Sequence, residues 1–245
     1  MNSSDLSVKM SELDEQRFGV RTAKAVKVTP DNLTSVLGFC RENQVELLIA
    51  RCSAVHIGTV HSMEKEEFLL MDTLVYFSAR LDDNSILDDD GSVSIRPIRP
   101  GEEQEVREVA EKAFKGYYGH YHADERLDRT KCDEVYVDWA YRSCLSKELA
   151  DEVLVAEIGG IEGFATLRIN TPEEGEGVLF AVSPSVQGRG VYRKFMINGM
   201  KWCFSKGCSS MVVSTQITNL AVQRSWARLG FVPTGYVYTF HKWFD

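Results

Sequence analysis

The sequence has 245 residues, of which 44% are hydrophobic and 26% charged, a balance typical of a folded globular protein with one large or two modest domains. Its net charge of −8 and its pI of about 5.3 argue against nucleic acid as the main partner. No apolar run approaches the roughly 20 residues of a membrane-spanning helix, which argues against a membrane protein.

The N-terminus and the cysteines both favour a cytoplasmic protein. The opening stretch, MNSSDLSVKMSELDEQ, contains no apolar signal core. The six cysteines form neither a C-x-x-C pair nor a Cys/His cluster with zinc spacing; they are Cys40, Cys52, Cys132, Cys144, Cys203 and Cys208. We therefore expect reduced thiols, no bound metal and a cytoplasmic location.

Residues 1–81 are expected to form a small α/β domain. Alternating or apolar runs predict strands, and Thr29-Pro30-Asp31 predicts the start of a helix whose apolar face includes Leu33 and Leu37. The predicted strands lie at 18–28, 45–50 and 68–77. The region contains no glycine-rich turn and no cluster of catalytic residue types, so its residues predict no function.

An acidic segment, DDNSILDDDG at 82–91, holds five aspartates and little apolar content. Charge repulsion and low hydrophobicity favour a solvated linker, so we place the domain boundary here. A cation site is the alternative, but the spacing lacks the EF-hand pattern and its closing glutamate. Residues 92–245 then form the second domain.

The second domain is predicted to alternate strands and helices in a clear order. Val93–Ile98 reads as a strand and is followed by helices at 101–114 and 133–146. Two β-type runs around Gly159-Gly160 predict a hairpin. The remaining elements are a buried strand at 177–182, a helix from about 191, a strand at 211–215, a helix at 219–229 ended by Gly230, and a last strand at 237–240.

A glycine turn links the strand at 177–182 to the helix that follows it. Its sequence is Gln187-Gly188-Arg189-Gly190-Val191-Tyr192. Two glycines at a strand-to-helix turn leave backbone N–H groups bare, and the positive end of the helix dipole reinforces them, so the turn can bind a phosphate or pyrophosphate. The alternative is a plain turn in which the glycines serve only positive φ. The pattern fits neither a Rossmann turn, which needs GxGxxG, nor a Walker A loop, which needs GK followed by Ser or Thr.

This turn resembles the acyl-CoA loop of the Gcn5-related N-acetyltransferases (GNAT), whose pattern is Q/R-x-x-G-x-G/A. Gln187, Gly188 and Gly190 fit, whereas Tyr192 stands where the family has Gly or Ala. Three further stretches resemble the family in the same order: VSIRPIRPGE, VLVAEIGGIEGFATL and NLAVQRSWARLGF. The resemblance covers residues 93–245 and implies a GNAT fold of the α/β (α+β) class with a mixed, mostly antiparallel sheet, preceded by a degenerate GNAT-like domain.

The resemblance also implies an acyl-CoA co-substrate and a set of residues that bind it. In the family, the strands that correspond to 177–182 and 211–215 splay apart, and the pantetheine arm lies in the gap between them. By this resemblance, a backbone N–H near Val182 polarises the thioester carbonyl. The implied coenzyme-binding residues are Phe180, Ala181, Val182, Gln187, Gly188, Arg189, Gly190, Val191, Tyr192 and Asn219. Asn219 fits equally an N-cap.

The proton donor and the base are less clear. The family often places a tyrosine at the position of Trp226, and an indole cannot act as an acid. We expect Ser225 to point elsewhere on its helix, which leaves Tyr236, Tyr238 or water, and the thiolate can also leave unaided. A histidine is the usual side chain for a base near neutral pH, so His120 and His122 of the aromatic loop are the candidates. The predicted catalytic residues are Val182, Asn219 and His122.

An aromatic loop and the helix after it are the predicted acceptor site. Stacked rings beside an arginine suit a nucleotide base and its diphosphate, although Tyr136 and Trp139 also fit the core face of a helix. The predicted substrate-binding residues are Tyr121, His122, Asp124, Arg126, Tyr136, Trp139 and, on the hairpin, Arg168.

The segment at 113–143 and the N-terminal half-domain are similar to those of dTDP-fucosamine acetyltransferase and related dTDP-amino-sugar N-acyltransferases. This resemblance implies a homodimer that transfers an acyl group to the amino group of a dTDP-linked amino sugar for bacterial surface polysaccharide. Two alternatives stay open: a GNAT enzyme for another amine, such as a polyamine, an antibiotic or a protein N-terminus, and a non-catalytic acyl-CoA-binding module.

Overall fold

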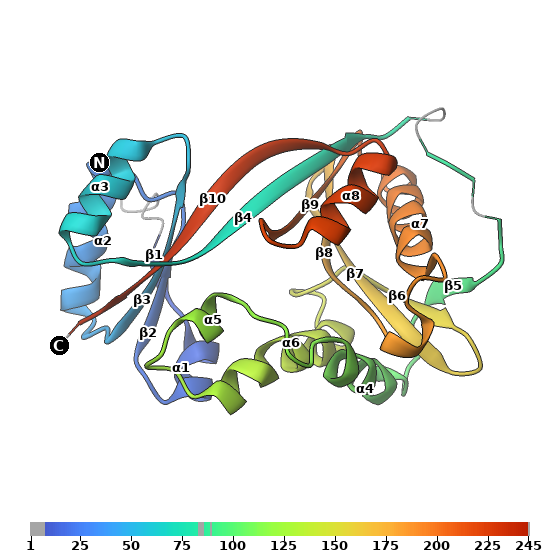
Figure 1. The fold of residues 1–245 in the computed structure, drawn as a ribbon, viewed down its shortest axis with the longest axis horizontal. Helices are drawn as coiled ribbons and strands as arrows, with labels where there is room; N and C mark the ends of the chain where they lie inside the picture. Colours follow the sequence, from blue (N-terminus) through green and yellow to red (C-terminus); the bar gives the residue numbers. More distant parts are fainter. Residues whose placement is uncertain (1–7, 83–85, 89, 245) are drawn as a thin grey trace. The chain divides into compact units, whose positions relative to one another are not determined.

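The structure, a computed structural model, describes residues 8–82, 86–88 and 90–244 and divides into two compact units. Unit 1 comprises residues 8–75, 118–132 and 235–244. Unit 2 comprises the described part of 76–117 together with 133–234. Strands β4 (Leu69–Arg80) and β10 (Val232–Trp243) each continue from one unit into the other (Figure 1).

Unit 1 is built on a small mixed sheet with the strand order β1-β2-β3-β10. β2 and β3 are parallel, while β1 with β2 and β10 with β3 are antiparallel. Its strands are β1 (Val8–Met10), β2 (Thr22–Ala25), β3 (Leu47–Ser53) and parts of β4 and β10; its helices are α1 (Glu12–Phe18), α2 (Pro30–Glu42), α3 (Ile57–Lys65) and α5 (His120–Ala123).

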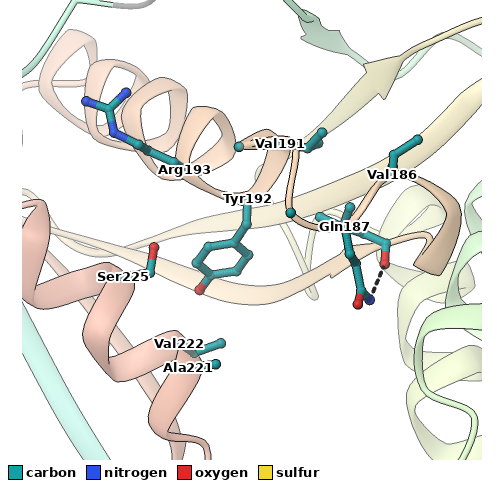
Figure 2. Close-up of a pocket in the computed structure, with 11 residues that line it drawn as sticks. Val186, Gln187, Val191, Tyr192, Arg193, Ala221, Val222 and Ser225 are labelled. Atoms are coloured by element: carbon teal, nitrogen blue, oxygen red, sulfur yellow. Dashed lines mark hydrogen bonds between the residues drawn. The ribbon is translucent and has the colours of Figure 1, made fainter.

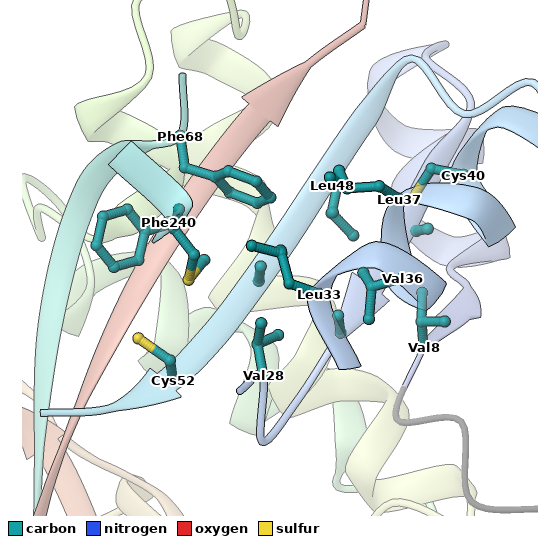
Figure 3. Packing of buried hydrophobic residues seen from close by; sticks show 14 of the residues in the cluster. Val8, Val28, Leu33, Val36, Leu37, Cys40, Leu48, Cys52, Phe68 and Phe240 are labelled. Atoms are coloured by element: carbon teal, nitrogen blue, oxygen red, sulfur yellow. The ribbon is translucent and has the colours of Figure 1, made fainter. Parts of the chain in front are cut away.

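One face of this sheet carries the hydrophobic core of unit 1. Leu48, Ala50 and Cys52 of β3 alternate with residues of the opposite face and pack with Phe240 of β10 against α2 and α3 (Figure 3). Helix α2 begins with a capping box, in which Thr29 and Asn32 exchange hydrogen bonds between side chain and backbone. The core therefore fixes the register of β10 on β3, because a shift by one residue would turn Phe240 to the other face.

Unit 2 has the strand order β4-β9-β8-β7-β6-β5. β5 to β8 are paired antiparallel, and β8 and β9 are parallel. Its further strands are β5 (Ser94–Pro97), β6 (Glu152–Glu157), β7 (Ile161–Thr171), β8 (Glu174–Val182) and β9 (Ser210–Gln216); its helices are α4 (Glu103–Ala113), most of α6 (Arg129–Leu145), α7 (Val191–Ser205) and α8 (Leu220–Arg228).

The parallel pair of β8 and β9 separates at one end. Their residues are partnered from Glu174 with Ser210 to Gly177 with Val213, whereas 178–182 and 214–216 have no partners in this pair. Alternate backbone groups of a strand point to the same side, so the separated ends present unpaired backbone groups to the space between them. The splay implied by the family resemblance is therefore present.

Two segments of the chain repeat the same order of elements, strand, helix, strand, helix and long strand. The first runs from β2 to β4, and the second from β8 to β10. The last three elements of each segment have equal lengths and are all displaced by 163 positions: Leu47 corresponds to Ser210, Ile57 to Leu220, and Leu69 to Val232. The long strands are exchanged, because β10 pairs with β3 while β4 lies next to β9.

The predicted elements of 92–245 are all present, with bounds that differ by a few residues. The predicted strand at 18–28 is wrong in its first part, because Phe18 ends helix α1 and Gly19 caps it at φ 70°. Short helices α1, α3 and α5 were not predicted, since seven, nine and four residues give little periodicity.

The two units differ from the predicted domains 1–81 and 92–245. The division falls within β4, between Val75 and Tyr76, and both 118–132 and the C-terminal end join unit 1. The reason is the exchange of strands β4 and β10, which cannot be predicted from the local sequence of either strand. In the predicted linker, Asp83, Asn84, Ser85 and Asp89 lie outside the described residues, while Asp90 pairs with Lys194 of unit 2.

In the described part of the chain, every helix is too short or too polar to cross a membrane. Over the same residues, no three His, Cys, Asp or Glu side chains gather as metal ligands would. All six cysteines are free thiols.

Candidate coenzyme pocket

The strand β8 leads into α7 through a tight turn. After Val182, a short 3₁₀ turn at Pro184–Val186 reverses the chain, and the Gln187 side-chain amide donates to the Val182 carbonyl at 3.2 Å (Figure 2). Gly188 and Gly190 then adopt φ of 78° and 80°, a region that favours glycine. This geometry agrees with the plain-turn interpretation, and it also leaves the backbone N–H groups of the following helix free to bind a ligand.

The turn leaves the N-terminus of α7 without a cap. Gly190 precedes the helix and has no side chain to accept from it, and within the described residues no acceptor binds the N–H groups of the first turn, Val191 to Arg193. A Cβ built at Gly188 or Gly190 would meet open space. Bare N–H groups, the positive end of the α7 dipole and open space together suit an anion such as a pyrophosphate.

These N–H groups border a pocket of about 340 Å³. The turn and α7 form one side, and the first two turns of α8 form the other (Figure 2). Its volume lies within the range of small-molecule sites. The lining residues are Val182, Val186, Gln187, Gly188, Gly190, Val191, Tyr192, Arg193, Ala221, Val222 and Ser225.

Tyr192 of α7 and Trp226 of α8 connect the two helices beside this pocket. The Trp226 indole Nε1 donates to the Tyr192 hydroxyl at 2.9 Å, and the Tyr192 ring lies 5.7 Å from that of Phe180. Trp226 is 2% exposed and also packs on Phe77. Burial raises the pKa of the Tyr192 phenol, so it remains protonated at neutral pH.

Helix α8 turns a different face to the pocket than we predicted. Ser225 lines the pocket together with Ala221 and Val222, so the expectation that Ser225 points elsewhere is wrong. Ala221 and Ser225, which are four residues apart, share the face of the helix that borders the pocket, whereas Trp226 is buried in the core. Asn219 is the N-cap: its Oδ1 accepts from Val222 N at 3.4 Å and its Nδ2 donates to Thr215 at 3.1 Å.

The structure gathers most of the predicted coenzyme residues around the pocket. Six line it: Val182, Gln187, Gly188, Gly190, Val191 and Tyr192. Phe180, Ala181, Arg189 and Asn219 are not among the lining residues; Phe180 contacts Tyr192, Ala181 is buried, and Arg189 is exposed. The sequence analysis missed Val186, Arg193, Ala221, Val222 and Ser225, although the small residues at 221 and 225 carried a signal by their spacing.

The predicted acceptor residues are distributed over both units. Tyr136 and Trp139 pack against the core around α4 and β7, which is the alternative that we left open for them. Arg168 pairs with Glu176 at 2.5 Å and bonds Asn170. These three residues belong to unit 2.

The other four, Tyr121, His122, Asp124 and Arg126, belong to unit 1. His122, the candidate base, is 5% exposed, and its Nδ1 accepts from the N–H of Gly119 at 3.2 Å. Asp124 accepts from His241 and Trp243, and the Arg126 guanidinium lies 4.1 Å from the centre of the Trp243 ring. No role of these residues toward a substrate follows from this geometry alone.

Comparison with known proteins identifies the class of protein that carries this fold and pocket. The pattern of the Acetyltransferase (GNAT) family matches residues 104–231, which is more than half of the chain, and no curated protein matches. The chain belongs to the GNAT acetyltransferase family. It is therefore an acyl-CoA-dependent N-acyltransferase, and this class sets aside the non-catalytic module.

Solved structures share the fold at low identity. A GCN5-related N-acetyltransferase from Sphaerobacter thermophilus matches with a TM-score of 0.65 and 16% identity over 96% of this chain and 76% of its own. A tandem GNAT protein from the clavulanic acid biosynthesis pathway matches at 0.63 and 12%, over 92% and 76%. A glucosamine N-acetyltransferase region of a fungal multi-domain β-N-acetylglucosaminidase matches at 0.64 and 13%, over 96% and 31%.

Proposed function

We propose that this acetyltransferase transfers an acyl group, acetyl or a short hydroxyacyl, from CoA to the amino group of a dTDP-linked amino sugar. The product would enter the synthesis of a bacterial surface polysaccharide. The observation that carries the coenzyme half of this proposal is the uncapped N-terminus of α7 beside the pocket. The acceptor half rests on the resemblance of residues 113–143 to sugar-nucleotide N-acyltransferases.

In this proposal the pyrophosphate of CoA binds the N–H groups of Gly188 to Arg193. The pantetheine arm continues between the separated ends of β8 and β9, where unpaired backbone groups can bond its amides as a neighbouring strand would. A backbone N–H near Val182 polarises the thioester carbonyl. The Gln187 side chain holds the Val182 carbonyl at 3.2 Å and so fixes the end of the strand.

The chemistry is a direct attack by the acceptor amine. The neutral amine nitrogen forms a bond to the thioester carbonyl carbon, the carbon–sulfur bond breaks, and the amine loses one proton as the thiolate leaves. An ordinary thiol has a pKa of about 8.5, so the thiolate is a fair leaving group near neutral pH and takes up the proton afterwards. The protein therefore contributes chiefly orientation and polarisation of the carbonyl.

Two observations support an amino sugar as the acceptor. The fold is shared with a protein named for glucosamine N-acetylation, so this architecture is compatible with an amino sugar. The aromatic and basic residues of 113–143 are of the types that stack on a base and pair with a diphosphate. The homodimer that the resemblance implies stays a prediction.

A thiol-release assay tests the proposal. The purified 245-residue protein is given acetyl-CoA or other acyl-CoAs and, separately, dTDP-amino sugars, polyamines and peptides with a free N-terminus. We expect turnover with dTDP-amino sugars alone, because only they carry both the amine and the diphosphate. Turnover confined to polyamines or peptides would overturn the sugar proposal, and silence with every amine would overturn it as well.

A further inference from the structure

The second face of the unit 1 sheet carries several polar side chains, unlike the core face. Antiparallel partners point to the same side, so Arg51 of β3 shares this face with its partner Thr239 of β10, and Ile49 shares it with His241. Lys24 of β2, the parallel partner of Ile49, lies on the same side. An arginine, a lysine, a histidine and a threonine therefore occupy adjacent positions on one sheet face.

Both acids that face this side are already engaged. Asp14 of α1 pairs with Lys24 at 2.5 Å and also accepts from the Tyr121 hydroxyl at 2.9 Å. Asp124 lies 2.6 Å from His241 Nδ1 and accepts from the Trp243 indole at 2.9 Å. Each carboxylate thus has its own donors, and neither is bonded to Arg51.

Arg51 and Thr239 each contribute a buried polar atom to this face. The Arg51 Nε and the Thr239 Oγ1 are buried, and among the described residues nothing bonds them. Thr239 is fully buried, whereas the rest of Arg51 keeps an intermediate exposure. A buried donor without an acceptor is costly, and a guanidinium without a counter-charge more so, so such a pair is most stable with an anion between its groups.

We infer that this face of unit 1 binds a phosphate group of a small-molecule ligand. The guanidinium of Arg51 would hold two of its oxygens, and the Thr239 hydroxyl would donate to a third. The site differs from the α7 N-terminus in kind, because it is made of side chains on strands of unit 1. Its phosphate could come from an acceptor such as a sugar nucleotide or from free phosphate.

Anion binding at this face should be coupled to protonation of His120. Its Nδ1 lies 2.9 Å from His241 Nε2, and if His241 Nδ1 donates to Asp124, His120 donates to His241 and keeps a free lone pair on Nε2. An anion bound nearby would favour protonation of that nitrogen. Binding of an anion that does not itself titrate, such as sulfate, should then tighten as pH falls, by at most about tenfold per pH unit.

The surroundings of His120 are consistent with this linkage. Burial lowers the pKa of His120 well below 6.5, and the neighbouring His241, Arg51, Lys24 and His122 lower it further. The charged and titratable groups on the elements packed around His120 are Asp14, Lys24, Arg51, Tyr121, His122, Asp124 and His241. Lys24 pairs with Asp14, and Asp124 accepts from His241 and Trp243, so Arg51 is the cation of this group that can pair with an added anion.

Histidine-selective nitrogen-15 NMR of the full chain tests the inference at the site itself. The protein has five histidines, and phosphate is titrated to tens of millimolar at pH 7. We expect the side-chain signals of His120 and His241 to shift with saturation, while those of the exposed His56 and His61 stay unchanged. No shift at His120 and His241 would overturn the site, and so would equal shifts at all five histidines.

Arg51→Met is the diagnostic variant, and Arg41→Met, at an exposed position on α2, is its matched control. Arg51→Met should abolish the saturable shifts or weaken them at least tenfold, with an unchanged or higher thermal midpoint because it removes a buried donor that has no acceptor. Arg41→Met should bind phosphate as the wild type does. Wild-type phosphate affinity in Arg51→Met would show that Arg51 does not hold the phosphate and would overturn the site.

Thr239→Val keeps the shape of the side chain and removes its hydroxyl, so it serves if Arg51→Met fails to fold. It should weaken phosphate several-fold, and wild-type affinity would again overturn the site. Repeating the titration with dTDP shows whether the phosphate belongs to a nucleotide. The inference does not depend on the proposed function: phosphate binding without sugar acylation, or the reverse, would separate the two.

Discussion

At the scale of single residues, Tyr192 and Trp226 are two departures from the family pattern that form one hydrogen-bonded pair. Tyr192 stands where the GNAT loop has a small residue, and Trp226 stands where many members have a tyrosine. In this chain they meet in one hydrogen bond of 2.9 Å beside the pocket. The indole has only a donor and the phenol can accept, so each substitution makes sense in the presence of the other.

A double-mutant cycle tests this coupling. Tyr192→Phe leaves the buried Trp226 N–H without an acceptor and should lower the free energy of unfolding by about 1–2 kcal/mol. Trp226→Phe removes the same bond from the other side. We expect a coupling energy of about 1 kcal/mol in urea unfolding, since the double variant cannot lose the bond twice. A coupling near zero would show that the bond contributes nothing to stability.

Trp226→Phe also tests a catalytic assignment. An indole cannot donate its proton as an acid, so activity should remain within a few-fold of wild type once a substrate is known. The measurement is kcat with the protein still folded by circular dichroism. A loss above a hundredfold in a folded variant would show that Trp226 takes part in the reaction, directly or by holding Tyr192.

Gly190 offers the sharpest test of the coenzyme loop. Gly190→Asp places a carboxylate before the bare N–H groups of α7, where it would both cap the helix and repel a pyrophosphate. We expect CoA binding by calorimetry to be lost. Gly190→Ala is the matched control, because it carries the same cost of positive φ, about 1 kcal/mol, without the charge. Equal CoA affinity in wild type and Gly190→Asp would refute the assignment of the loop.

At the scale of elements, the two repeats differ where the coenzyme pocket lies. In the second repeat, the turn from 183 to 190 separates β8 from α7 and leaves the helix N-terminus open. In the first, only residues 26–29 separate β2 from α2, and Thr29 closes the helix with a capping box. The first repeat therefore lacks the loop and the free N–H groups, so we expect one coenzyme per chain.

The exchanged strand β10 makes the C-terminus part of the core of unit 1. Phe240 is 1% exposed and packs with residues of β3 and α2 that lie far away in the sequence. Phe240→Ala should lower the free energy of unfolding by about 3–5 kcal/mol and should speed hydrogen exchange in β2 and β3. Tyr236→Ala, at a position 42% exposed on the same strand, is the control and should change both little. Unchanged exchange in β2 and β3 would show that β10 does not support this core.

The features that could be predicted from the sequence are those that depend on residues close together in the chain. The glycine turn, the hairpin and the order of elements were predictable, because each depends on residues near one another in the chain. The exchange of β4 and β10 was not, since both strands read the same whichever sheet they join. The face of α8 was misjudged for a similar reason: nothing in NLAVQRSW says that Trp226 would find an acceptor on another helix.

At the scale of the whole molecule, stability should depend on pH through groups of unit 1. His120 is neutral in the folded protein, because burial and nearby positive groups hold its pKa well below 6.5. The unfolded chain takes up a proton there as pH falls through 6.5, whereas the folded chain does not. The unfolded state then binds more protons, so stability falls on acidification from this point.

The acids act in a lower window. Burial raises the pKa of Asp14, but the Lys24 ammonium and the hydrogen bonds around the carboxylate outweigh it and leave the pKa below 3.8. For Asp124, the bonds from His241 and Trp243 likewise outweigh burial. A depressed acid pKa contributes stability above the unfolded value, which is lost only as pH falls below 3.8. The hydrogen bonds from Arg96 lower the pKa of Glu102 from 4.5 to about 2, so that carboxylate starts to lose its contribution near pH 4.5. The range between pH 6.5 and 5 therefore isolates the histidine.

We expect the thermal midpoint of the wild type to fall steadily between pH 6.5 and 5, with His120 contributing at most about 1.4 kcal/mol per pH unit. His120→Asn should flatten this part of the profile, because asparagine does not titrate. His61→Asn, at an exposed position on α3, should keep the wild-type slope. A wild-type slope in His120→Asn would place the titrating group elsewhere. Added sulfate should reduce the slope in the wild type, since an anion beside His120 would let the folded state bind the proton too.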